Sequence, residues 1–239
     1  MKERSKILLI IPAYNEAENI EDHIRNLIQN YPQYDYVVIN DCSTDRTEEI
    51  CRRNGFNFIS QPVNLGIGGT VQCGYLYATE KGYDIAVQVD GDGQHDPAYI
   101  ETIIEPLMKE QADMVIGSRF IEKNGFQSSS MRRVGIQFLC SVIKFICKIS
   151  ITDATSGFRA TNKRLTAFFA NEYAYDYPEP EAIVSACLSG FKIQERPVLM
   201  RERAGGVSSI SRLKSVYYML KVTMAIVICR LNYSKRRSN

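Results

Sequence analysis

Two aspartates, Asp90 and Asp92, are separated by one glycine and directly follow an apolar run at residues 85–89. If that run is a buried strand, both carboxylates leave the strand end together and can face one point. Oxygen ligands at this spacing suit Mg²⁺ or Mn²⁺ held jointly with a diphosphate, whose charge the metal would neutralise. The plain alternative is a solvated turn between a strand and a helix. Nearby His95 is expected to be a structural hydrogen-bonding residue rather than a ligand.

Polar residues also follow the apolar runs at residues 6–11 and 34–40. Tyr14 could stack on a base, and Glu16 could accept a hydrogen bond from a sugar or a base. Asp41 resembles the strand-end carboxylate that holds a ribose hydroxyl in nucleotide-binding sheets. The alternatives are an ordinary strand-to-helix turn at residues 11–16 and a helix cap at Asp41.

The glycines of residues 64–69 (NLGIGG) do not form a dinucleotide fingerprint, because Val71 stands where the last glycine of GxGxxG would be. They either let the backbone approach a ligand or pack closely, or form a plain turn. Further along, Glu179 and Glu181 stand near a predicted helix start. They are candidates for a general base or for hydroxyl binding, or else favourable charges at a helix N-terminus.

Arginines recur beside small polar residues in the second half of the chain. They are Arg119, Arg132, Arg133, Arg159 and Arg203. Arginine suits phosphate recognition, although any one of these side chains could equally be a solvated surface charge. Their repetition beside apolar helical segments favours a phosphate-binding surface.

The elements that position these residues alternate strand and helix five times. Strands are expected at residues 6–11, 34–40, 56–60, 85–89 and 114–116, and helices lie between them. This pattern predicts an α/β fold with a mostly parallel sheet and helices on both faces. Ligands of such sheets lie beyond the carboxyl ends of the strands, where the polar residues collect. Residues 152–159 are expected to form a loop and residues 191–199 an edge strand.

The C-terminal part differs in character. Residues 132–149 and 211–231 read as amphipathic helices that carry lysine and arginine. Residues 201–239 hold nine Lys or Arg and one acid, whereas the whole chain has a net charge of only +2. Such helices can lie among anionic lipid headgroups, or they can pack on the sheet or on a second subunit. No uncharged apolar run is long enough to predict a membrane-spanning helix.

Composition narrows the class of protein. With 45% hydrophobic and 23% charged residues in 239, the chain is a globular protein and not a disordered or collagen-like one. Its seven cysteines show no CxxC pair, and no signal peptide begins the chain, so reduced thiols in a cytoplasmic protein are expected. Nucleic acid is not an expected partner, because no aromatic and basic platform accompanies the basic tail.

Taken together, the segments IPAYNE, NDCSTD, NLGIGG, DGDGQHDP, GSRF, DATSGFR and RAGGVSS occur in an order that resembles glycosyltransferase family 2. Within it, the chain is similar to the dolichyl- and polyprenyl-phosphate sugar transferases, over roughly residues 6–221. The resemblance implies a GT-A fold, a nucleotide-sugar donor, a divalent metal and inversion at the anomeric carbon. It divides the chain into a catalytic domain at residues 1–200, with a donor half (1–120) and an acceptor half (121–200), and a membrane-associating segment at 201–239.

The resemblance also implies roles for individual residues. Nucleotide contacts are expected at Pro12, Tyr14, Glu16, Asp41, Asn64, Gly68 and Asp90. Metal ligands are expected at Asp90, Asp92 and Gln94. Catalytic roles, mostly in holding phosphates, are expected at Asp92, Arg119, Arg133 and Arg203, with Glu181 as the base if the acceptor is a hydroxyl. Acceptor contacts are expected at Ser156, Gly157, Arg159 and Ser208.

Two departures from the family pattern stand out. Relatives often have lysine after the serine of the last motif, whereas Ser209 follows Ser208 here, which puts one phosphate contact in doubt. Several relatives continue into membrane-spanning helices, and this chain ends at Asn239. A separate small membrane protein would then supply the missing anchor, and such a protein or a second copy of the chain is an expected partner.

The sequence therefore predicts an enzyme that moves one sugar from a nucleotide sugar to polyprenyl phosphate at the cytoplasmic face of the cell membrane, for glycan or envelope polysaccharide synthesis. UDP-glucose-like donors are favoured over GDP-mannose, with N-acetylglucosamine as a further candidate sugar. One alternative is a family 2 enzyme that extends a glycan on a sugar hydroxyl with Glu181 as base. Another is a non-catalytic membrane scaffold.

Overall fold

Alternating side chains of the first strand organise the whole molecule into layers. In β1 (Ile7–Ala13), Leu8 and Ile10 are buried in one cluster, while Leu9 and Ile11 are buried in another. Successive residues of a strand point to opposite faces of its sheet, so β1 lies between two apolar layers. The computed structural model describes residues 5–122, 130–200 and 212–236.

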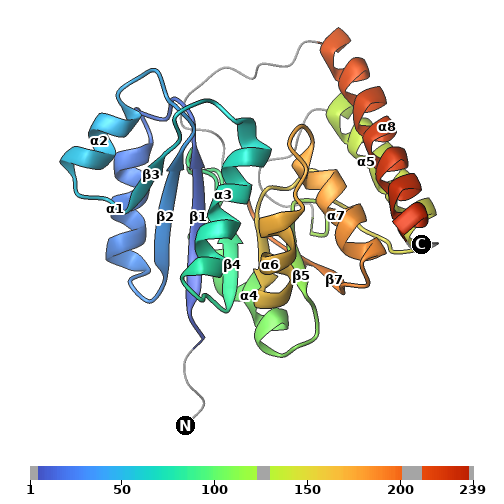
Figure 1. Cartoon of the computed structure of the whole chain (residues 1–239), viewed down its shortest axis with the longest axis horizontal. Coiled ribbons are helices and arrows are strands. Elements are labelled where there is room, and N and C mark those ends of the chain that lie inside the picture. The colour runs from blue at the N-terminus through green and yellow to red at the C-terminus, as the bar shows by residue number, and fades with distance from the viewer. Residues whose placement is uncertain (1–4, 123–129, 201–211, 237–239) are drawn as a thin grey trace.

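A seven-stranded sheet with the order β3-β2-β1-β4-β6-β5-β7 forms the middle layer (Figure 1). Its strands are β1, β2 (Asp35–Asn40), β3 (Phe58–Ser60), β4 (Ile85–Gln88), β5 (Met114–Ser118), β6 (Arg159–Asn162) and β7 (Ile193–Pro197). The helices are α1 (Ile20–Asn30), α2 (Thr47–Arg53), α3 (Gly66–Glu80), η1 (Pro97–Tyr99), α4 (Ile100–Met108), α5 (Ser130–Cys147), α6 (Lys163–Asn171), α7 (Pro178–Leu188) and α8 (Arg212–Arg236).

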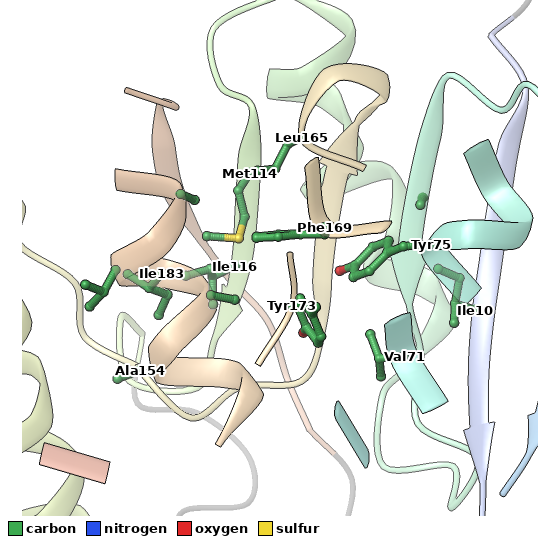
Figure 2. Close-up of a cluster of buried hydrophobic side chains, with 14 of the residues drawn as sticks. Ile10, Val71, Tyr75, Met114, Ile116, Ala154, Leu165, Phe169, Tyr173 and Ile183 are labelled. Carbon is green, nitrogen blue, oxygen red and sulfur yellow. The ribbon is translucent and has the colours of Figure 1, made fainter. Parts of the chain in front are cut away.

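The two faces of the sheet are covered by different helices. Helices α1, α2 and α4 contribute to the cluster that contains Leu9, and α3, α6 and α7 to the cluster that contains Leu8. Figure 2 shows the second cluster, in which Tyr75 of α3 lies beside Phe169 and Tyr173. The ring centroids of Tyr75 and Phe169 are 5.4 Å apart, and those of Tyr75 and Tyr173 are 5.3 Å apart.

The mostly parallel α/β architecture matches the expectation from sequence, and β7 is the edge strand expected near residues 191–199. The loop expected at residues 152–159 ends in a strand that the sequence did not reveal. Strand β6 pairs antiparallel with both β4 and β5. Strand β1 also continues through Pro12 to Ala13, beyond the predicted end at residue 11.

At one end of the sheet, helices α5, α7 and α8 pack together, far from α1 and α2 (Figure 1). Val222 and Ile226 of α8 are fully buried against this group, and so are Leu139 and Ile143 of α5. Among the residues that the structure describes, no helix has both the length and the apolar character to cross a membrane.

Candidate functional site

The polar residues predicted to share a site follow neighbouring parallel strands. Strand β1 lies between β2 and β4 and runs parallel to both, so the three carboxyl ends meet at one edge of the sheet. Loops after β1 and β2 are joined by the side chain of Asn15, whose Oδ1 accepts a hydrogen bond from the Thr44 backbone N at 2.8 Å. Asn15 itself has φ 56°, a left-handed conformation that asparagine tolerates better than most residues.

Tyr14 and Glu16 flank this junction. The Tyr14 ring is about half exposed at the edge, and Pro12 is buried in β1. The Glu16 backbone N donates to Thr47 Oγ1 at 2.8 Å, and its carboxylate accepts from Asn19 Nδ2 at 3.0 Å. Tyr14 is therefore the side chain of this loop that is most open to a flat ligand such as a nucleotide base.

Asp41 is buried, and its carboxylate binds the backbone. One oxygen accepts from Leu65 N at 2.7 Å and the other from Gly66 N at 2.9 Å. Asp41 thus caps the start of α3 rather than the helix that follows it in sequence. Asn64 belongs to the same arrangement, because its Nδ2 donates to the Asp41 carbonyl at 3.3 Å and its Oδ1 accepts from Gly66 N at 3.1 Å.

The glycine at position 68 is packed against the backbone of residues 174–175. A Cβ at this position would lie 2.2 Å from the Ala174 carbonyl oxygen and 2.6 Å from the Tyr175 Cα. The absence of a side chain is therefore explained by packing of α3 against residues 174–175.

The Asp90–Asp92 segment leaves β4 in a tight loop that His95 holds in place. His95 is buried, stacks on Phe158 with 4.9 Å between ring centroids, and accepts a hydrogen bond at Nδ1 from the Asp90 backbone N at 3.0 Å. Its Nε2 lies 3.5 Å from Asp90 Oδ2. The structural role predicted for His95 is confirmed.

The two carboxylates have different environments. Asp90 retains a third of its side-chain surface, and its Oδ1 accepts from Gln88 Nε2 at 3.3 Å. Asp92 is buried, and its Oδ1 accepts from the Gln94 backbone N at 3.0 Å. Gln94 thus braces Asp92 through its backbone, while its own side chain is half-buried.

Gly157 lies directly against this loop. A Cβ built there would be 2.9 Å from Gln88 Nε2 and 3.2 and 3.3 Å from the two oxygens of Asp90. The neighbouring Ser156 is buried, and its hydroxyl accepts from Phe158 N at 3.3 Å. The structure therefore brings the predicted acceptor motif next to the predicted metal ligand.

Two predicted phosphate-binding arginines are buried in the protein. Arg119 forms two 2.7 Å bonds to the fully buried Asp153, from Nε and from Nη2, and Nη2 also donates to Thr155 Oγ1 at 3.0 Å. Arg159 donates to the carbonyls of Ser156 and Glu179, both at 2.6 Å, and to that of Ala154 at 3.3 Å.

The acceptor contact expected at Arg159 is wrong, because its buried guanidinium is held by backbone carbonyls. Arg119 is likewise engaged by a carboxylate rather than presented to solvent. Arg133 is exposed on α5. Arg203 and Ser208 lie outside the described residues.

Glu181 lies half-buried in the first turn of α7. Burial raises the pKa of Glu181 to about 7, and the negative charge of Asp176 adds to the effect. A carboxyl group with such a pKa is poised to exchange a proton near neutral pH. His23 of α1 is buried, and burial lowers its pKa to about 4.

The oxygen-rich loop fits a divalent metal that takes most of its ligands from a diphosphate and water. In the ranges 5–122, 130–200 and 212–236, no group of three or more His, Cys, Asp or Glu side chains is arranged as a metal cage. Mg²⁺ in nucleotide sites is commonly held by one or two carboxylates plus phosphate oxygens. Asp90 and Asp92 supply that donor set.

Sequence reasoning missed Gln88, Asn15 and Asp153. Gln88 gave a signal, since it is the only polar residue of an otherwise apolar strand. Asn15 and Asp153 gave none, because their partners lie about 30 residues away in the chain.

Comparison with known proteins identifies relatives over most of the chain. Residues 8–168 match the family described as Glycosyl transferase family 2. The UDP-N-acetylglucosamine–dolichyl-phosphate N-acetylglucosaminyltransferase of Methanococcus voltae is 30% identical over 246 residues, covering 93% of this chain and 98% of that protein. The undecaprenyl-phosphate mannosyltransferase of Micrococcus luteus is 28% identical, and the aligned region covers 86% of this chain and 88% of that protein.

A solved structure shares the fold. Glucosyl-3-phosphoglycerate synthase from Mycobacterium tuberculosis, in complex with Mn²⁺, UDP and phosphoglyceric acid, superposes with a TM-score of 0.71 at 19% identity. The match covers 95% of this chain and 78% of that one. The seven-stranded sheet and its helices are thus those of a GT-A protein.

Proposed function

The chain belongs to glycosyl transferase family 2 and is a glycosyltransferase, and from this premise we propose that it transfers one sugar from a UDP-sugar to polyprenyl phosphate at a membrane surface. The choice of polyprenyl phosphate as acceptor is supported by one observation. Nearly the whole chain is similar to enzymes that are named for dolichyl phosphate and undecaprenyl phosphate. The scaffold alternative has no support from these relatives.

The donor is assigned to the edge formed by β1, β2 and β4. Tyr14 offers an exposed ring for the base, and Asp90 and Asp92 offer carboxylates for a Mg²⁺ or Mn²⁺ ion shared with the diphosphate. That ion would stabilise the negative charge of the departing UDP. UDP with Mn²⁺ or Mg²⁺ in the structural relative supports the same assignment, as does UDP in the name of the Methanococcus voltae enzyme.

The acceptor is assigned to the surface of α5 and α8. Neither Ser130–Cys147 nor Arg212–Arg236 contains an Asp or a Glu. Large apolar side chains are exposed on both helices: Val134, Phe138, Phe145, Leu220, Met224, Val227, Ile228 and Leu231. We call these eight residues the apolar helix face. An apolar surface with basic flanks and no acids fits the boundary between acyl chains and anionic headgroups.

An open groove between the two helices adds to this assignment. It has a volume of about 430 Å³ and is lined mostly by apolar side chains, namely Val142, Phe145, Ile146, Val227 and Leu231, together with Ser141 and Arg230. A groove lined in this way suits an isoprenoid chain better than a sugar.

The chemistry of a phosphate acceptor requires little from a base. A phosphate monoester has a second pKa near about 6 and is already anionic at neutral pH. The protein must therefore position two anions close together, which calls for cations and not for proton removal. The proposed sources of positive charge are Arg133, which is exposed, and Arg203 of the RAGGVSS segment.

The test is sugar transfer from labelled UDP- and GDP-sugars to polyprenyl phosphate in detergent with Mn²⁺, beside an Asp92→Asn protein. The proposal expects an acid-labile, labelled lipid from one UDP-sugar that the variant does not form. Absence of any lipid product from folded protein supplied with a candidate membrane partner would refute it. The same panel identifies the sugar.

A second candidate acceptor is a hydroxyl group, with Glu181 as general base. The raised pKa of Glu181 favours this role, because a base is most effective when its pKa lies near the working pH. Glu181→Gln separates the two reactions. Transfer to a hydroxyl would be abolished, whereas transfer to a phosphate would keep most of its rate.

A further inference from the structure

Three packed helices each carry a cysteine, and two of these cysteines are in contact. The three are Cys147 at the end of α5, Cys187 in α7 and Cys229 in α8, and we call them the thiol cluster. The Cys187 thiol donates to the Cys147 carbonyl oxygen, with 3.5 Å between Sγ and O, and the two thiols also interact with each other. Cys229 is close enough to influence Cys147 electrostatically.

The cluster adjoins the groove proposed for the lipid, since Arg230 lines that groove and is close enough to influence Cys187, but it is away from the donor edge. Helix α7 is about 16 Å long at 1.5 Å per residue. Its first turn is near the site, because the Glu179 carbonyl accepts from Arg159, while Cys187 lies eight residues further on. All three cysteines are partly exposed.

The three thiols are chemically unequal. The hydrogen bond from Cys147 holds the pKa of Cys187 below its usual value, with help from the nearby Arg230 guanidinium. The same interaction raises the pKa of Cys147. By contrast, burial raises the pKa of Cys51 and of Cys140 to about 11. Because the thiolate is the reactive form, Cys187 is the nucleophile of the cluster.

We propose that Cys147 and Cys187 form a reversible disulfide that links α5 to α7. A low-molecular-weight disulfide such as glutathione disulfide is the oxidant. The Cys187 thiolate attacks one of its sulfurs, which forms a mixed disulfide and releases one glutathione thiolate. Cys147 then loses its proton to water and attacks Cys187 Sγ, which forms the protein disulfide and releases the second thiolate. The protein is oxidised by two electrons and the oxidant is reduced to two thiols.

A structural metal is the competing explanation for clustered cysteines. In the part of the chain that the structure describes, no three His, Cys, Asp or Glu side chains are arranged to hold a metal ion. A pair of hydrogen-bonded thiols on two adjacent helices is instead the arrangement from which a disulfide closes, once the Cα atoms lie about 4.4–6.8 Å apart.

In the experiment, the full-length reduced protein is treated with glutathione disulfide. Its peptides are then mapped by mass spectrometry with no reducing agent added, so that disulfides stay intact. We expect a cross-linked peptide pair joining Cys147 to Cys187 and the loss of two of the seven free thiols. Before oxidation, Cys187 should be alkylated at least tenfold faster than Cys140 at pH 7.5.

Three serine variants assign the chemistry. Cys147→Ser should stop at a stable glutathione adduct on Cys187, and Cys187→Ser should form no cross-link within the cluster. Cys229→Ser is the matched control and should still form the Cys147–Cys187 bond. Circular dichroism confirms that each protein is folded. The proposal is overturned if folded wild-type protein forms no cross-link, if the bond joins Cys229 instead, or if Cys187 is alkylated no faster than Cys140.

Discussion

Replacing Gly157 with alanine tests whether the loop after β4 is a metal site. The added methyl would lie 2.9 Å from Gln88 Nε2 and 3.2 and 3.3 Å from the Asp90 oxygens. An ordinary contact needs at least 3.4 Å, so Gln88 Nε2 must move by about 0.5 Å and the Asp90 oxygens by less. Because Gln88 Nε2 donates to Asp90 Oδ1, a shift of the amide also displaces the partly exposed Asp90 carboxylate, by up to about 0.5 Å.

The expected effect follows from this displacement. A misplacement of about 1 Å at a reacting centre can cost roughly 10²-fold in rate, so 0.5 Å corresponds to about tenfold. If Asp90 binds the metal, the Mn²⁺ concentration that gives half-maximal transfer should rise by about that factor, and excess Mn²⁺ should restore part of the rate. The backbone at Gly157 is not left-handed, so alanine adds no conformational strain there.

The assay is a Mn²⁺ titration of sugar transfer, accompanied by thermal unfolding. Gly117→Ala is the matched control for crowding, because its methyl would meet only the apolar side chains of Val198 and Phe158, at 3.0 to 3.1 Å. That variant should lose stability and keep its Mn²⁺ dependence. An unchanged Mn²⁺ titration for Gly157→Ala would refute the assignment of Asp90 as a ligand.

Three further predictions concern other parts of the molecule. Because burial raises the pKa of Glu181 from 4.5 to about 7, the folded state favours the protonated carboxyl group, and this stabilisation is present below pH 4.5 and lost as the pH rises through 7. The Tm of the wild type should therefore fall relative to that of Glu181→Gln between pH 5.5 and 8, and parallel Tm curves for the two proteins would contradict the raised pKa. Arg159→Met should lower the free energy of unfolding by about 3 kcal/mol or more in urea titrations, since three buried carbonyls lose their hydrogen-bond donor. A variant that is as stable as the wild type but binds the acceptor more weakly would instead support the acceptor contact predicted for Arg159 from the sequence. Phe145 is 77% exposed, so Phe145→Ser should weaken binding to anionic liposomes about tenfold and leave Tm unchanged. If the variant binds liposomes as well as the wild type does, the apolar helix face contacts something other than lipid.

The donor half of the fold was predictable because its rules are local. Each of the first five strands is a short, mostly apolar run, and four of them end at a polar residue. The carboxyl ends of parallel strands meet at one edge whatever the loops between them do. Asp90 and Asp92 were therefore placed correctly at that edge without knowledge of any long-range contact.

The acceptor half depends on contacts that no local pattern encodes. Strand β6 is only four residues long and reads as polar, and it becomes a strand because β4 and β5 pair with its two edges. Phe158, which directly precedes β6, and Ala160 face one apolar cluster, so the intervening Arg159 faces the other side and bonds there to carbonyls. Arginine looked like a surface residue because burial of a charge is costly unless every donor finds a partner.

Helix α7 connects the two surfaces on which the proposed reaction depends. The Glu179 carbonyl in its first turn accepts from Arg159, which also donates to the Ser156 carbonyl. The next residue, Gly157, lies so near Asp90 that an added Cβ would be 3.2 Å from its carboxylate. Its other end contacts α5, and its side packs against α8, the two helices that carry the apolar helix face. A lipid phosphate held at that face would thus be positioned relative to the donor metal by a single helix and by buried hydrogen bonds. Such rigid positioning is what a reaction between two anions requires, because their repulsion must be overcome by fixed geometry and cations.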